Sequence, residues 1–139
     1  MSKKSVNVLL SVLSLVAGGA FYVLFRADSY IAKAFNGMCS ILYLREKLHP
    51  HFSDFLNFYF LDFLWGFSLA CALIALFDSE IKERATCCSV SLLCGIAWEV
   101  LQYEGFVGGT ADFLDVIMYL LAALFAFIIN IKEKTHEKH

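Results

Sequence analysis

The sequence contains few residues that break helices and few that carry charge. It has one proline, Pro50, and charged residues make up 17% of its 139 residues. A formal net charge of −2 gives no bulk electrostatic reason to bind nucleic acid. The sequence also lacks a phosphate-binding loop, a GxGxxG run, an HExxH zinc signature and the residue order of a serine triad. Nucleotide binding, hydride transfer and serine-triad hydrolysis therefore have no support, and no cofactor is predicted.

The five cysteines show no CxxC spacing and fall mostly in apolar segments. Thiols in such surroundings act as small hydrophobic side chains far more often than as metal ligands or redox groups. We therefore predict that they are buried and free. They are Cys39, Cys71, Cys87, Cys88 and Cys94.

Long apolar runs dominate what is present. Hydrophobic residues make up 60% of the chain and the mean hydropathy is +0.68, whereas soluble domains hold roughly 45–50% apolar residues. About twenty apolar residues are enough for a helix to cross a ~30 Å hydrocarbon core. The runs predict an all-α membrane protein, a single integral membrane domain over residues 1–139 with four transmembrane helices. The spans are about 6–25, 55–77, 86–103 and 113–131.

The first run has a competing interpretation as a cleavable signal peptide. Lys3 and Lys4 give it a positive start, and the small residues 17–20 resemble a cleavage site. The apolar run continues to Phe25 without a polar break, which favours a retained span.

A different pattern fills residues 30–48, between the first and second spans. Apolar residues recur there at helical spacing, and charged residues occupy the other positions or the end. Only about ten residues, Phe35 to Leu44, are free of charge, which is too short for a fifth span. We therefore predict a helix that lies in the membrane interface.

Lysine and arginine are unevenly distributed between the two sides of a four-span protein. The side with both termini and the loop 78–84 holds seven of them, and the other side holds four. The positive-inside rule therefore predicts that both termini are cytoplasmic.

Acidic residues gather at the ends of spans that this topology places outside. Carboxylates at membrane depth are costly and usually have a function or a partner. The spacing of Glu99 and Gln102 puts them on one face of the third span with Gly95, which allows a neighbouring helix to approach closely. Asp112 and Asp115 share a face of the fourth span with Tyr119, and Asp112 is also placed to cap that helix.

We predict that these side chains converge on one polar pocket that opens to the outside. Glycines at positions 105, 108 and 109 favour a tight hairpin between the last two spans. The pocket residues are Asp62, Glu99, Gln102, Asp112 and Asp115. The secondary candidates are Asp54, Trp65, His51 and Tyr119.

The last hairpin resembles that of the VanZ-like membrane proteins. The resemblance rests on the run WEVLQ, a glycine-bearing loop, and the run TADFLDVIMYLLAALFA. Glu99 and Gln102 match the first polar pair of that family, Asp112 and Asp115 match the second, and Tyr119 stands where asparagine is common. The arginine that the family often has in this loop is absent. The resemblance implies a small multi-pass protein of the bacterial cell membrane.

Three classes of function fit these residues. The first is a protein that binds an envelope component, a lipid head group or a cation in the acidic pocket. The second is an enzyme that uses Glu99 with Asp115 or Asp62 for acid–base chemistry. The third is a structural partner, and the fourth span carries small residues that would suit a homodimer. His49 and His51 could add ligands to a metal site, although no metal-ligand spacing is present, so no metal is predicted.

Overall fold

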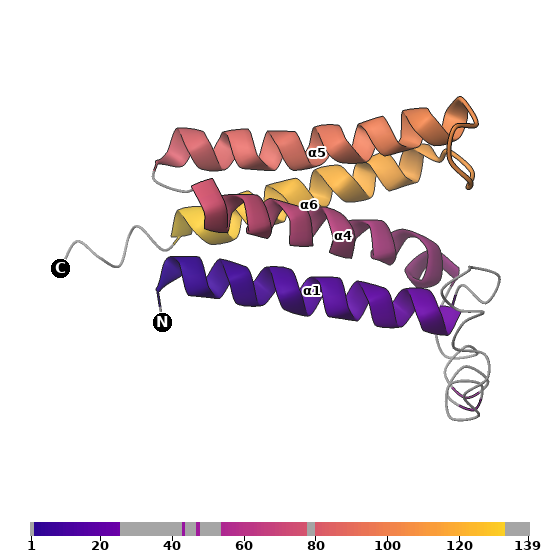
Figure 1. Cartoon of the computed structure of the whole chain (residues 1–139), viewed down its shortest axis with the longest axis horizontal. Coiled ribbons are helices and arrows are strands. Elements are labelled where there is room, and N and C mark those ends of the chain that lie inside the picture. The colour runs from indigo at the N-terminus through magenta and orange to yellow at the C-terminus, as the bar shows by residue number, and fades with distance from the viewer. Residues whose placement is uncertain (1, 26–42, 44–46, 48–53, 78–79, 133–139) are drawn as a thin grey trace.

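Four long helices run antiparallel to their neighbours along the chain. The computed structural model describes residues 2–25, 43, 47, 54–77 and 80–132. The helices are α1 (Lys3–Phe25), α4 (Asp54–Phe77), α5 (Ile81–Tyr103) and α6 (Phe113–Lys132). As Figure 1 shows, α1 begins at the same end of the bundle at which α6 ends. Each is long and apolar enough to cross a membrane, so the described part of the chain contains the four helices that the sequence predicted as candidate spans.

The third helix begins before the predicted start of its apolar run. Glu80, the N-cap residue, and Glu83, in the first turn of the helix, form a capping box, in which the Glu80 backbone N–H donates to Glu83 Oε2 at 3.1 Å. The helix therefore includes part of the segment 78–84, which the charge pattern predicted to be a loop. Asp54 is the first residue of α4, while the predicted interfacial helix over 30–48 lies outside the described residues except at positions 43 and 47.

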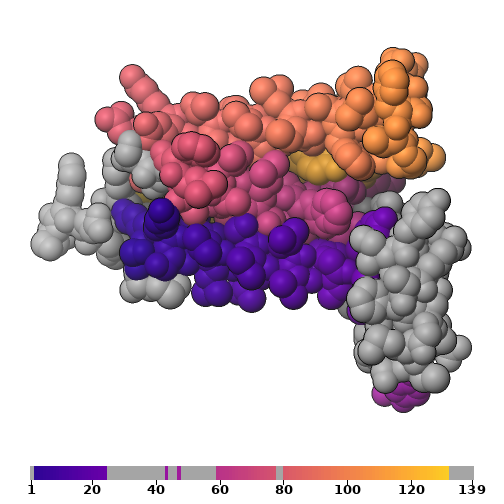
Figure 2. Space-filling model, in the orientation of Figure 1, coloured from indigo at the N-terminus to yellow at the C-terminus, as the bar shows by residue number. Residues whose placement is uncertain are grey.

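Helix α4 lies at the centre of the bundle, in contact with α1, α5 and α6. Small residues allow close packing there, because Ala70 and Cys71 of α4 and Ala122 and Ala126 of α6 are fully buried. Figure 2 shows α1 and α5 at opposite edges of the bundle, with α4 between them. The outer faces of these helices are apolar and exposed, as expected for contact with lipid.

The cysteine prediction is confirmed at three described positions. Cys71, Cys87 and Cys88 are free and buried in the core between α4 and α5. Cys94 is free but exposed, because it lies on the outer face of α5.

A buried polar cluster joins three helices at the end where α1 begins. The Asn7 side chain donates to Asn130 Oδ1 at 2.8 Å, and the Asn130 amide donates in return to Asn7 Oδ1 at 3.2 Å. Arg84 is buried in α5 and donates to the Asn130 backbone carbonyl at 2.8 Å. These bonds fix the end of α6 against α1 and α5, and they explain how Arg84 is accommodated inside the bundle.

Candidate acidic site

The turn between α5 and α6 determines where the acidic side chains meet. Gly105, at a φ of +75°, ends α5 in a Schellman motif. Its N–H donates to the Gln102 carbonyl at 3.0 Å, and the Phe106 N–H donates to the Leu101 carbonyl at 2.9 Å. Gly109 also has a positive φ, +134°, and lies against the Gln102 side chain. The predicted tight hairpin is confirmed, and it returns the chain beside the end of α5.

Asp112 joins three helices at this turn. Its Oδ1 accepts from the Leu114 backbone N–H at 3.0 Å, which confirms the predicted helix cap. Its Oδ2 accepts from the Tyr59 hydroxyl of α4 at 2.9 Å. Its own backbone N–H donates to Glu99 Oε2 of α5 at 3.1 Å. Asp112 is therefore both a cap and a connection between helices.

Glu99 is buried beneath this turn, with 6% of its surface exposed. With the Gln102 amide assigned in the orientation that satisfies both neighbours, its nitrogen donates to Glu99 Oε2 at 3.2 Å. The amide oxygen then accepts from the Trp98 indole at 3.1 Å. The donors to Glu99 are thus a backbone N–H and a neutral amide.

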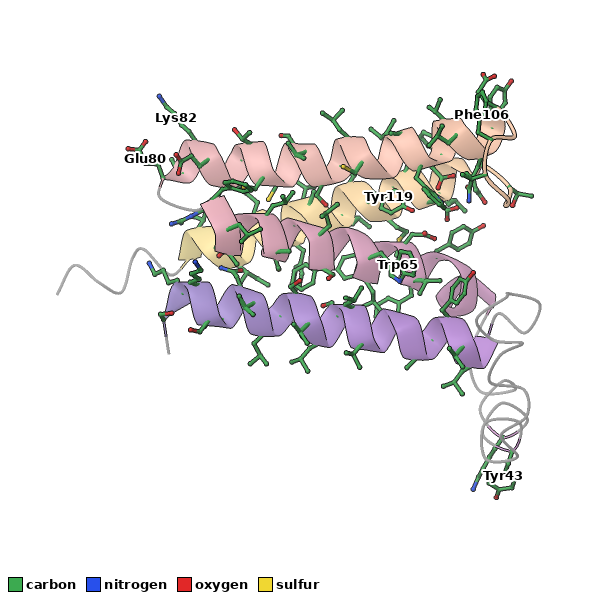
Figure 3. All side chains as sticks on the ribbon, in the orientation of Figure 1. Tyr43, Trp65, Glu80, Lys82, Phe106 and Tyr119 are labelled. Atoms are coloured by element: carbon green, nitrogen blue, oxygen red, sulfur yellow. The ribbon has the colours of Figure 1, made fainter. Side chains whose placement is uncertain are left out.

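Asp62 and Tyr119 form the deeper part of the site. The Tyr119 hydroxyl donates to Asp62 Oδ1 at 2.9 Å. Asp115, one turn before Tyr119 on α6, lies close to Asp62. The Tyr119 ring is buried, and Gly66 and Gly95 leave the space that it fills. Figure 3 shows Tyr119 on the face of α6 that is turned toward its neighbours.

The structure brings the five predicted pocket residues and Tyr119 together at one end of the bundle. Asp115 lies within electrostatic range of Asp62, Glu99 and Asp112. The residues at the turn and the deeper residues around Asp62 therefore form one acidic network. We use this name for the set Tyr59, Asp62, Glu99, Gln102, Asp112, Asp115 and Tyr119.

Trp65, a secondary candidate, does not join the acidic network, although it follows Asp62 on α4 by three residues, a spacing typical of side chains on one side of a helix. It packs against α1, where a Cβ added at Gly18 would lie 2.7 Å from its indole nitrogen. Its ring centroid is 6.1 Å from that of Tyr22. The side chain of Asp54, and all of His51, lie outside the residues whose side chains the structure describes.

The sequence analysis missed one member of the network, Tyr59, and one of its neighbours, Trp98. Tyr59 lies three residues before Asp62, so the same helical spacing could have found it. The hydrogen bond of Trp98 to Gln102 has no signal in the sequence. Both supply neutral hydrogen-bond donors.

Among the described residues, no group of three or more His, Cys, Asp and Glu side chains is arranged to hold a metal ion. A mainly apolar groove of about 370 Å³ lies elsewhere, between the end of α4 and the beginning of α5. Its lining includes Leu73, Cys87 and Val90, and none of the network residues.

In comparisons with known proteins, no family profile, curated protein or solved structure matches the chain. We therefore base the function on the geometry of the acidic network.

Proposed function

We propose that the chain is a VanZ-like integral membrane protein that binds a positively charged group at the acidic network. The group is a cation or the amine of a lipid head group or another envelope component. The supporting observation is that α4, α5 and α6 hold four carboxyl groups in one network: Asp62, Glu99, Asp112 and Asp115.

The electrostatics of the network favour a cationic ligand. Carboxylates that lie close together repel, and the repulsion grows as the surroundings become less polar. The hydrogen bonds to Glu99 and Asp112 come from backbone, amide and hydroxyl donors, which orient the oxygens without neutralising them. A bound ammonium group would relieve the repulsion and form charge-assisted hydrogen bonds.

The network lies at the end of the bundle opposite to the start of α1 and the end of α6. With both termini in the cytoplasm, as the excess of Lys and Arg on their side favours, the site would face outward from the bacterial membrane. Thr110 is exposed in the turn at this end. Labelling of Thr110→Cys in intact cells by an impermeant maleimide tests this orientation, and labelling only after lysis would contradict it.

The ligand proposal is tested by removing one charge at a time. Phosphatidylethanolamine carries an amine, whereas phosphatidylglycerol of the same acyl chains has no cationic group. Native mass spectrometry should show selective retention of phosphatidylethanolamine by the wild-type protein, or calorimetric titration should show binding of Mn²⁺. A charge-assisted hydrogen bond contributes about 1.5–3 kcal/mol, so Glu99→Gln and Asp115→Asn should each weaken binding by about ten- to a hundredfold.

Glu104→Gln is the matched control. It makes the same change of charge at the same end of the bundle, but Glu104 is exposed at the end of α5, outside the network. It should leave binding unchanged. Should the wild type bind neither probe, while Glu99→Gln and Asp115→Asn lower thermal stability, the network would be structural and the proposal wrong.

A further inference from the structure

Three aromatic side chains stand exposed around the turn that covers the acidic network. Tyr103 at the end of α5 is 81% exposed, Phe106 in the turn is 78% exposed and Phe113 at the start of α6 is 76% exposed. We call these three residues the loop aromatic patch. Removing the surface of an aromatic ring from water is favourable. Rings that are this exposed gain that free energy only if something outside the bundle covers them.

The backbone holds the patch in place. Phe106 follows Gly105 in the Schellman motif, and the N–H groups of Phe106 and Val107 both donate to the Leu101 carbonyl, at 2.9 and 3.4 Å. Phe113 opens α6 directly after the cap residue Asp112. The exposure of these rings is therefore a consequence of ordered local structure.

The length of the helices places the patch at the edge of the hydrocarbon core. Helices α5 and α6 have 23 and 20 residues. At 1.5 Å per residue they are about 30–35 Å long, which matches a hydrocarbon thickness of ~30 Å. Val100, three residues before Tyr103 on α5, and Leu114, which follows Phe113 on α6, are also exposed apolar residues. The same lipid that surrounds the spans therefore reaches the patch.

We infer that the loop aromatic patch inserts into the boundary between the head groups and the acyl chains of the bilayer. Aromatic side chains favour that level of the membrane. The insertion fixes the depth of the α5–α6 turn. It therefore holds Asp112 near the level of the lipid head groups and Glu99, four residues before Tyr103, about one helical turn deeper. The inference rests on the spanning helices and the patch, and it does not depend on what the acidic network binds.

Quenching by brominated lipid tests the insertion. The two native tryptophans are replaced by phenylalanine, and Phe106→Trp is compared with Thr110→Trp in nanodiscs of phosphatidylcholine brominated on the acyl chains near the ester. Both positions are exposed on the protein surface, so a difference in quenching between them reports their different depth in the lipid. We expect strong quenching of the indole at position 106 and weak quenching at position 110. Equal quenching at the two positions would overturn the inference.

A second measurement covers the case in which the tryptophan variants do not fold. Phe106→Cys and Thr110→Cys are labelled by a water-soluble maleimide in nanodiscs that hold one chain, where no second copy can cover the patch. The reactive thiolate is disfavoured in an apolar environment, so position 106 should react at least about tenfold more slowly. Equal rates would refute the insertion, and protection only in discs with two chains would show that a second copy covers the patch instead.

Discussion

Replacement of Gly95 by alanine is the sharpest test of how the network is packed. A Cβ at this position would lie 2.8 Å from Cδ1 of the Tyr119 ring and closer still to Cγ and Cδ2. Carbon atoms in good contact are about 3.5–4.0 Å apart, so the ring would have to move by about 1 Å. The Tyr119 hydroxyl is 2.9 Å from Asp62 Oδ1, and a shift of that size would break or strain the bond.

The expected loss of stability is the sum of two destabilising contributions and one stabilising contribution. Overpacking of a close contact costs about 1–3 kcal/mol. Loss of the hydrogen bond to Asp62 adds about 1 kcal/mol. The better helix propensity of alanine returns about 1 kcal/mol. Gly95→Ala should therefore lower the free energy of unfolding by about 1–3 kcal/mol.

Equilibrium unfolding in detergent, or steric trapping in bicelles, measures this change. Gly19→Ala in α1 is the matched control, because a Cβ there would meet nothing within 4 Å, and it should be neutral or slightly stabilising. In a Tyr119→Ala background the ring is gone, so Gly95→Ala should cost little, and the double-mutant cycle should give a coupling energy of about 1–3 kcal/mol. A cost for Gly95→Ala that persists in the Tyr119→Ala background would refute this account of the packing.

Two other substitutions test the turn and the opposite end of the bundle. Gly109→Ala should destabilise by about 1–3 kcal/mol in the same unfolding assay, because its φ is +134° and a Cβ would overlap the Gln102 side chain, whereas Gly108→Ala should stay within about 0.5 kcal/mol. Asn7→Ala should cost about 0.6–1.7 kcal/mol, the range for hydrogen bonds between membrane helices, because Asn130 loses its partner in α1. Equal effects of the two glycine changes, or a neutral Asn7→Ala, would contradict these contacts.

The parts of this protein that follow from its sequence are those set by short-range periodicity and by length. Twenty-residue apolar runs predicted the four helices because the hydrocarbon thickness leaves little choice. The spacing of Gly95 and Glu99 on α5, and of Asp115 and Tyr119 on α6, predicted which faces would meet. The contacts of Tyr119 with Gly95 and Asp62 are the result.

The parts that could not be predicted depend on how helices rotate against one another. Trp65 follows Asp62 by three residues, which is consistent with a shared face, but α4 has neighbours on several sides and Trp65 turns toward α1. The start of α5 could not be predicted because it also depends on a contact with another helix. From its charge, Arg84 is expected in a loop. In the structure it lies in α5, because its side chain donates to the Asn130 carbonyl of α6.

Hydrogen bonds join α1 to the rest of the bundle. The acidic network is built from α4, α5 and α6, and α1 covers the other side of α4. Ser68 of α4 is buried and donates to the Ser11 carbonyl of α1 at 2.9 Å, while Asn130 is buried against Asn7. Removal of α1 would leave both polar groups facing lipid without these partners, at a cost of about 1–3 kcal/mol for each. The polar contacts of α1 therefore contribute to the stability of the four-helix bundle.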